Sequence, residues 1–361
     1  MTAAKPTPGA PAPPAQATSA HEPQGAHEAP RFRRPLRLGT RRSKLALAQS
    51  ERVAESVRRI TGRPVELVEI TTYGDVSRAH LSEIGGQGVF VAALREAVVH
   101  GEVDLAVHSL KDLPTAQPDE LVIAAVPPRE DPRDALVARD GLGFEQLLEA
   151  GARPRIGTGS ARRACQLHAW ARSRGGAIET VPVRGNVGTR IGFVHKGELD
   201  AVALAAAGLS RLGRLAEATE LISLDTVLPA PGQGALAVEC ASSSARLTAQ
   251  LAELDDPQTR VAVTAERTLL AALEAGCSAP LGALADLHAE GPSGADMGTA
   301  STATEMRLRG VVGTPDGSAL VQLSATGPVP ASYDDAVALG SELAEEMLAK
   351  GAAGLMGERA L

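Results

Sequence analysis

Hydrophobic and polar residues alternate along the first part of the chain in a pattern that predicts strands followed by helices. The segment LRLGTRRSKLALAQSERVAESVRRITG (36–62) predicts a strand, a turn and then an amphipathic helix. Further strands are expected at 65–71, 103–109 and 121–127, with a helix within 88–102. Strands that alternate with helices indicate a mostly parallel sheet covered on both faces.

The same pattern returns in the middle of the chain and predicts a second α/β unit. Strands are expected within 155–160, 178–183 and 200–209, and helices over 161–173 and 187–197. The segment LPAPGQGALAVEC (228–240) is punctuated by Pro and Gly and then becomes strand-like, so we expect it to return the chain to the first unit.

The last third follows a different order. A long helix is expected over about 257–275, followed by two strands within 306–327 that meet at the turn sequence TPDG, and then by an amphipathic helix over 333–351. This order predicts a small α+β domain.

These elements predict an α/β protein with two similar domains around a cleft and a smaller C-terminal α+β domain. The expected divisions are a disordered Pro/Ala-rich tail at 1–34, a first domain at 35–130 plus 233–253, a second at 131–230 and a third at 256–361. Residues 289–305 are expected to form a flexible insertion. Ligands of such folds bind at the carboxyl ends of the strands, where helices begin.

Composition narrows the class of protein. The 361 residues carry a formal net charge of −7 and only 2% aromatic residues, which argues against a nucleic-acid binder. Three widely separated cysteines lack zinc-ligand spacing and favour a reducing, cytoplasmic compartment, and no metal site is expected. No run of 18 apolar residues predicts a membrane span, and nothing in the sequence requires a partner, so we expect a monomer.

Basic residues are concentrated in one part of this acidic chain. Residues 151–196 contain eight arginines and one lysine but only one acid, Glu179. Helix N-terminal N–H groups and guanidinium groups together form strong anion sites, and arginine suits carboxylates. We interpret the arginines beside Gly or Ser at helix starts as ligand-binding, namely Arg162, Arg163, Arg184 and Arg190. Arg153, Arg172 and Arg174 fit solvated surface positions better, and phosphate would suit the cluster as well as a carboxylate.

The segment AVHSLKDLPT (106–115) places a carboxylate at the end of an apolar strand. Asp112 is either a turn former or the one negative group in a positive cleft. In the second case it could stabilise a cationic intermediate or transfer protons.

One cysteine lies in a glycine-containing loop. Cys277, in LEAGCSAPLG, is either an inert thiol or an accessible nucleophile, whereas Cys165 and Cys240 are expected to be buried and inert.

Seven motifs in order resemble the porphobilinogen deaminase (hydroxymethylbilane synthase) family from about residue 36 to 284, and more loosely to the C-terminus. They are HSLKDLPT, EDPRDALV, GTGSARRACQL, RGNVGTR, AAGLSRLG, LPAPGQGALAVEC and TAERTLLAALEAGCSAPLG. The resemblance implies a transferase of tetrapyrrole (haem) biosynthesis. Such an enzyme joins four porphobilinogen molecules head to tail with loss of ammonia and releases hydroxymethylbilane by hydrolysis. It also implies two domains like type-II periplasmic binding proteins.

The resemblance further implies one dipyrromethane cofactor per chain, held by a thioether to Cys277. It assigns catalysis to Asp112, with porphobilinogen and the growing oligopyrrole chain as ligands, and no nucleic acid or membrane. The implied cofactor contacts are Lys111, Ser109, Ser160, Arg162, Arg163, Arg184, Asn186 and Thr158. The implied substrate contacts are Arg41, Ser43, Arg184, Arg190, Arg211 and Gln233.

The chain departs from the family pattern at a glycine-rich stretch, where Gln87 and Ala92 stand in place of the lysines of many members. Two alternatives remain on the residues themselves. A non-catalytic anion-binding protein would explain the arginines but not Asp112 or Cys277. A phosphate-ligand transferase is the other, although the chain contains no GxxxxGK[ST] motif.

Overall fold

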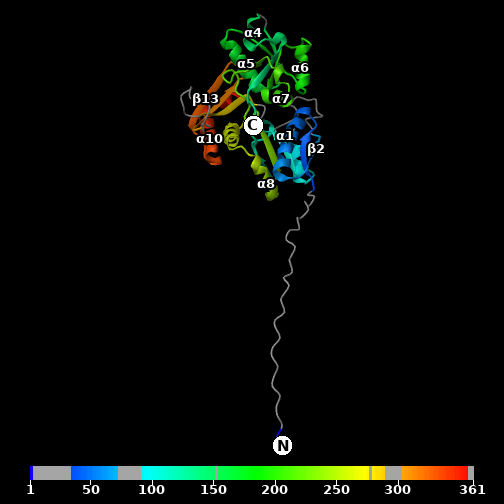
Figure 1. The fold of residues 1–361 in the computed structure, drawn as a ribbon. Coiled ribbons are helices and arrows are strands. Elements are labelled where there is room, and N and C mark those ends of the chain that lie inside the picture. Colours follow the sequence, from blue (N-terminus) through cyan, green and yellow to red (C-terminus); the bar gives the residue numbers. More distant parts are fainter. Residues whose placement is uncertain (3–33, 72–90, 151–152, 276–278, 289–302, 357–361) are drawn as a thin grey trace, which may run out of the picture. The chain divides into compact units, whose positions relative to one another are not determined.

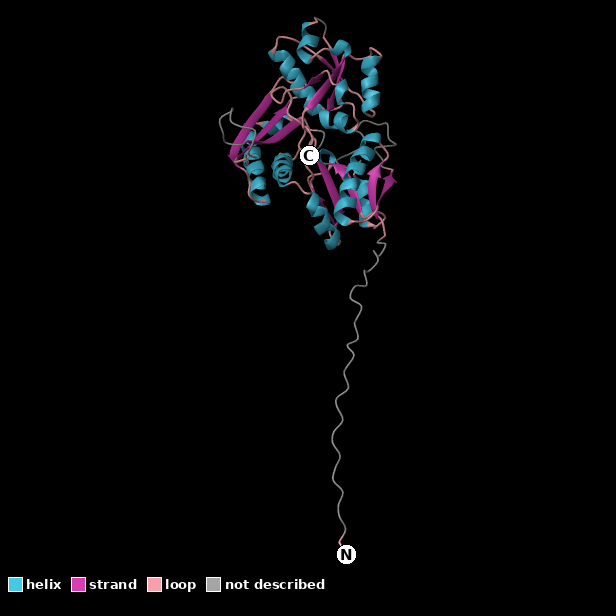
Figure 2. Cartoon of the chain, viewed as in Figure 1, coloured by secondary structure: helices cyan, strands magenta, loops and turns pink. Residues whose placement is uncertain are grey.

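The computed structural model describes residues 1–2, 34–71, 91–150, 153–275, 279–288 and 303–356. Residues 1–34 form one unit and Pro35–Leu361 another, and the fold below is that of the second unit. Its described strands form three sheets, each with helices packed against it (Figure 2).

The first sheet has five described strands in the order β2-β1-β3-β10-β4. They are β2 (Val65–Ile70), β1 (Leu36–Arg41), β3 (Leu105–Ser109), β10 (Leu236–Ala241) and β4 (Leu121–Ala125). β1 pairs in parallel with β2 and β3, whereas β10 runs antiparallel to both β3 and β4. Four strands therefore point in one direction, as the sequence predicts, and β10 alone opposes them.

The second sheet repeats this plan in the order β7-β6-β8-β5-β9. Its described strands are β7 (Glu179–Val181), β6 (Arg155–Gly157), β8 (Ala201–Ala205), β5 (Asp134–Ala138) and β9 (Glu220–Leu221). β5 is the single antiparallel strand here. In each sheet the opposing strand is the one that arrives from the other sheet, so the chain crosses between them twice, at 126–133 and 222–235.

Helices bury their apolar faces on both sides of each five-stranded sheet. On the first sheet, α1 (Lys44–Thr61) and α8 (Ala245–Leu251) share one core, and α3 (Ala92–Val99) packs on the other face. On the second sheet, α4 (Phe144–Glu149) and α5 (Ala161–Ser173) pack on one face, and α6 (Val187–His195) and α7 (Ala206–Arg211) pack on the other. Figure 1 draws the helices of the second sheet in green.

One predicted element is wrong in part. The strand expected over 200–209 ends at Ala205, and α7 begins at the next residue. A short apolar run fits a buried strand and a buried helix equally well, and the alanines at 205–207 favour a helix.

The third sheet carries the C-terminal part of the chain. Its described strands are β11 (Leu281–His288), β12 (Glu305–Gly313) and β13 (Leu320–Pro328), all antiparallel. Two long helices, α9 (Pro257–Ala272) and α10 (Tyr333–Ala349), share its core, and α11 (Ala352–Leu355) follows. The predicted α+β order is therefore confirmed, with β11 as an additional strand.

The β12–β13 turn is seated on helix α5 of the second sheet. Gly317 has φ +65°, and a Cβ there would lie 2.5 Å from both the Ala169 nitrogen and the Cys165 oxygen. Glycine is therefore required both by the backbone conformation and by the close approach to the helix.

Glu266, a buried carboxylate on α9, connects this helix to both crossings. It accepts hydrogen bonds from Arg129 (2.6 and 3.1 Å) in the first crossing and from the Gly232 amide (2.7 Å) in the second. It also accepts one from the Ala285 amide of β11 (2.9 Å). A single side chain thus connects three segments that are distant in sequence.

Candidate functional site

A short 3-10 turn at the carboxyl end of β3 carries Lys111 and Asp112. Asp112 is half-buried, and its carboxylate forms no hydrogen bond or ion pair with any residue that the structure describes. Lys111 donates from Nζ to Oε1 of Gln233 (3.1 Å). Burial and the nearby charge of Arg163 lower the pKa of Lys111 to about 8. The turn therefore presents an unengaged carboxylate beside a cation that itself lies near other cations.

Helix α5 begins with a side-chain N-cap, Ser160. The Ser160 side chain accepts from the Arg163 amide (3.4 Å), and Thr158 Oγ1 accepts from the Ser160 amide (3.2 Å). These side-chain oxygens satisfy two of the N–H groups at the start of the helix. Thr158 and Ser160 of the segment GTGS (157–160) thus cap the start of the helix, while the side chains of Arg162 and Arg163 extend away from it.

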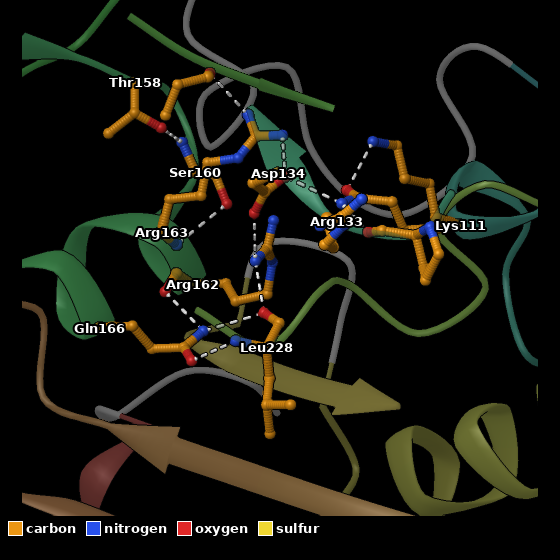
Figure 3. A network of polar contacts seen from close by, with 12 residues as sticks. Lys111, Arg133, Asp134, Thr158, Ser160, Arg162, Arg163, Gln166 and Leu228 are labelled. Atoms are coloured by element: carbon orange, nitrogen blue, oxygen red, sulfur yellow. Dashed lines mark hydrogen bonds and ion pairs between the residues drawn. The ribbon is translucent and has the colours of Figure 1, made fainter. Parts of the chain in front are cut away.

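Both arginines converge on Asp134, the first residue of β5 (Figure 3). Arg162 Nη1 donates to one carboxylate oxygen (2.8 Å) and Arg163 Nη2 to the other (2.7 Å). All three side chains are buried. Burial alone would raise the pKa of Asp134, but the two guanidinium charges outweigh it and hold that pKa well below its usual range.

Asp134 gives the arginine pair an internal partner that the sequence analysis missed. Arg162 also donates to the Leu228 carbonyl (2.5 Å), and Arg163 to the Ala203 carbonyl (3.0 Å). The sequence feature that could have indicated this partner is Asp134 itself, an acid at the start of the apolar run DALVA and 28 residues before Arg162. Arg163 still has a buried Nε without a hydrogen-bond partner among the described residues.

Gln233 connects Lys111 in the turn after β3 to Asp134, the partner of the two arginines. Its Nε2 donates to Oδ1 of Asp134 (2.8 Å) and to the Pro132 carbonyl (2.7 Å), while its Oε1 accepts from Lys111. The turn after β3 and the start of α5 are therefore linked through one fully buried amide.

A second group of predicted residues surrounds the start of α6. Asn186 is its N-cap and accepts from the Thr189 amide (2.9 Å), and Arg190 Nε donates to the Gly185 carbonyl (2.9 Å). Burial, together with the charges of Arg163 and Arg184, lowers the pKa of Arg190. Arg184 Nη2 is buried and has no hydrogen-bond partner within the described ranges.

Arg163 thus lies near Lys111 as well as Arg190, and we call Lys111, Arg163, Arg184 and Arg190 the basic cluster. Asp134 neutralises part of the charge at its centre, but Arg184 and Arg190 form no ion pair with a described residue. An anionic ligand would relieve the remaining repulsion.

The other predicted residues lie at the ends of β1, α1, β3 and α7. Arg41 ends β1 beside β3, and Ser43 is the N-cap of α1. Ser109 accepts from Gln49 Nε2 (3.1 Å). Arg211 is buried, donates to the Gly234 carbonyl (2.5 Å) and lines a cavity of about 200 Å³ together with Glu130.

The three cysteines differ. Cys277, like Gln87, lies outside the described residues. Cys165 and Cys240 are buried as predicted, and burial raises the pKa of Cys165 to about 11, so its thiol is a poor nucleophile at neutral pH.

The described residues contain no cluster of His, Cys, Asp and Glu suited to a metal ion. Among them there is also no helix long and apolar enough to cross a membrane.

Two family models match the chain. One, described as porphobilinogen deaminase, dipyromethane cofactor binding domain, matches residues 36–249. The other, described as porphobilinogen deaminase, C-terminal domain, matches residues 260–349.

Similar proteins carry the same name. Porphobilinogen deaminase 1 of Streptomyces avermitilis is 71% identical over 326 residues, which cover 90% of this chain and 98% of that protein. Porphobilinogen deaminase 1 of Streptomyces coelicolor is 69% identical over 325 residues, with 90% and 98% covered. Porphobilinogen deaminase of Thermobifida fusca is 52% identical over 324 residues, with 88% and 94% covered.

One solved structure with a similar fold is distant in sequence. A periplasmic substrate-binding protein of an ABC transporter from Coxiella burnetii aligns with a TM-score of 0.39 and 14% identity, covering 62% of this chain and 93% of that chain. A likeness this remote carries no argument about function.

Proposed function

This chain belongs to the porphobilinogen deaminase family. We propose that in this family's reaction the basic cluster binds carboxylates, Asp112 is catalytic and Cys277 anchors the cofactor. The reaction condenses four porphobilinogen molecules with loss of ammonia and releases hydroxymethylbilane. Family membership favours this enzyme over the anion-binding protein and the phosphate-ligand transferase.

The donor set fits a dipyrromethane cofactor. Each pyrrole unit derived from porphobilinogen carries two carboxylates, and the basic cluster offers buried N–H donors at Arg163 Nε and Arg184 Nη2 that no described residue accepts. When bound, the cofactor supplies the starter to which substrate units are added. We assign its carboxylates to Lys111, Arg163 and Arg184. Further polar contacts are assigned to Ser109, Thr158, Ser160 and Asn186. Arg162 supports this site through its ion pair with Asp134. Its covalent anchor is assigned to Cys277.

Incoming porphobilinogen is assigned to the remaining basic and polar side chains. These are Arg41, Ser43, Arg184, Arg190, Arg211 and Gln233. Gln233 acts by fixing Lys111 and Asp134, because its amide donors are already engaged with Asp134 and Pro132.

Asp112 is assigned the chemical role. Loss of ammonia leaves positive charge on the substrate carbon that carried the amino group. A fixed carboxylate stabilises this charge and accepts a proton at its Oδ atoms. The observation that carries the assignment is the half-buried Asp112 carboxylate, which is unengaged among the described residues and lies beside the basic cluster.

We further propose three domains with the boundaries given in the sequence analysis, in a monomeric cytoplasmic enzyme. The membership of β10 in the first sheet supports 233–253 as part of the first domain. The separate third sheet supports a domain that begins near 256. The cysteine usage supports the compartment.

Intact-mass measurement of the purified chain tests the assignment. We expect a covalent adduct of two pyrrole units that peptide mapping locates at Cys277, together with release of ammonia and hydroxymethylbilane from added porphobilinogen. Active protein with an unmodified Cys277 would contradict the proposed anchor.

Substitution of Arg184 should separate ligand binding from stability. Arg184→Met removes one cation with which no acid among the described residues pairs, so the melting temperature should stay the same or rise. The KM for porphobilinogen should increase at least about tenfold, because a charge-assisted hydrogen bond to a carboxylate is lost. Arg172→Met, at an exposed position on α5, is the control and should change neither quantity. An unchanged KM for Arg184→Met, with normal cofactor content, would refute the role of Arg184.

A further inference from the structure

Arg267, on α9 of the third domain, contacts the turn that carries Asp112. Its guanidinium donates to the carbonyls of Leu110 (3.3 Å), Leu113 (2.9 Å) and Pro114 (2.7 Å). These carbonyls lie on both sides of Asp112 in the sequence. One planar side chain therefore holds the backbone before and after the carboxylate.

The contact lies at the carboxyl end of the turn. The Leu113 amide closes the 3-10 turn Leu110–Asp112 by donating to the Leu110 carbonyl (3.1 Å). Arg267 is a second donor to that carbonyl and the donor to the two carbonyls that follow the turn, those of Leu113 and Pro114. A cation at the carboxyl end of a helical turn binds such carbonyls and interacts favourably with the local dipole. Arg267 acts here as a cap supplied by another domain.

The same face of α9 also supports the turn through apolar contacts. Val263, one helical turn before Arg267, belongs to the buried cluster that contains Leu110 and Leu113. Residues four apart on a helix lie on one face. The turn is thus packed against Val263 and hydrogen-bonded by Arg267.

We propose that Arg267 is a positioning residue that fixes the orientation of Asp112 for the condensation, a role that rests on the proposed function of Asp112. A displacement of about 1 Å in a reacting group can cost a factor of about 100 in rate. The same step recurs for every porphobilinogen added, so the loss should affect all four additions equally. Ligand binding, which depends on the basic cluster, should change little.

The test compares variants of the full chain with its cofactor attached. Arg267→Met should lower kcat by about 100-fold. KM for porphobilinogen should stay within about threefold of the parent value and the cofactor adduct should be retained. Arg267→Lys should recover part of kcat, because an ammonium can still donate to one or two of the carbonyls. If Arg267→Met does not fold, Arg267→Gln is judged by the same criteria.

Arg260→Gln is the matched control. Arg260 lies on the same helix and likewise reaches the first domain, donating to the Ile123 carbonyl (3.4 and 3.3 Å), but none of its hydrogen bonds goes to the 110–114 segment. Its kcat should remain within twofold of the parent value. This result separates positioning of Asp112 from general docking of the third domain.

Three results would overturn the proposal: a kcat for Arg267→Met or Arg267→Gln within twofold of the parent, an equal loss in Arg260→Gln, or a loss confined to KM. Asp112→Asn, measured in parallel, separates the two assignments. An active Asp112→Asn variant refutes the catalytic assignment and this proposal with it. An inactive Asp112→Asn variant beside a normal Arg267→Met variant refutes the role of Arg267 alone.

Discussion

Asp112→Asn is expected to lower kcat by about a thousandfold and to leave the melting temperature within a few degrees of the parent protein. The size follows from the loss of one preorganised charge at a developing cation together with one proton acceptor. The fold is spared because the Asp112 carboxylate is half-buried and holds no described residue in place. Turnover of porphobilinogen and thermal unfolding, measured on the same sample, test both parts.

Asp119→Asn provides the control for this substitution. Asp119 is an exposed carboxylate seven residues further along the chain, and its replacement should leave kcat unchanged. The catalytic assignment fails if Asp112→Asn retains more than about a tenth of the parent kcat. It also fails if both aspartate variants lose activity to the same extent.

Asp134→Asn should destabilise the protein rather than act on a single chemical step. The substitution leaves Arg162 and Arg163 buried without their counter-charge, and an amide N–H would face one of the guanidinium groups. Breaking a buried ion pair from one side costs about 3–5 kcal/mol in the free energy of unfolding. Urea unfolding at pH 7 measures the loss.

The difference in stability between the parent and Asp134→Asn should depend on pH in a direction set by the pKa of Asp134. The pKa of Asp134 is lower in the folded protein than in the unfolded chain, so its stabilisation is complete above the unfolded value of about 4. This stabilisation declines as the pH falls below about 4 towards the pKa of Asp134 in the folded protein. The difference in stability between parent and variant should therefore be constant near neutrality and shrink below about pH 4.

Asp200→Asn is the matched control for the buried pair. Asp200 also accepts from an arginine, Arg139 Nε (2.8 Å), and from a backbone amide, that of Arg155 (2.7 Å), but its pair is partly exposed. A solvated pair contributes about 1 kcal/mol or less. Equal losses in the Asp134 and Asp200 variants would contradict the special role of the buried carboxylate.

Local pattern was sufficient to predict much of the fold. The helical spacing of 161–173 and the turn sequence TPDG are local features, and the structure has α5 and the β12–β13 turn there. The short strand β5 was missed, because the four apolar or small residues after Asp134 give no period long enough to identify.

The site was predicted in outline but not in its pairings. Arginines beside capping residues marked the starts of α5 and α6, and the structure places Arg163 near both Lys111 and Arg190. The partners of buried charges could not be predicted, because they come from distant parts of the chain. Asp134 lies 28 residues before Arg162, and Glu266 lies 137 residues after Arg129.

The two crossings and Glu266 determine the order in which parts of the fold can form during translation. The ribosome releases the first four strands of the first sheet early, but the strand that fills the place between β3 and β4 is translated only after the whole second sheet. The hydrogen bonds from the two crossings to Glu266 can form only once α9 has been translated. The last donor to Glu266 along the chain is the Ala285 amide. The nascent chain therefore has an unpaired β3 edge until residues 236–241 of the 361 have been translated, and an unpaired strand edge of this kind is prone to aggregation and to chaperone binding.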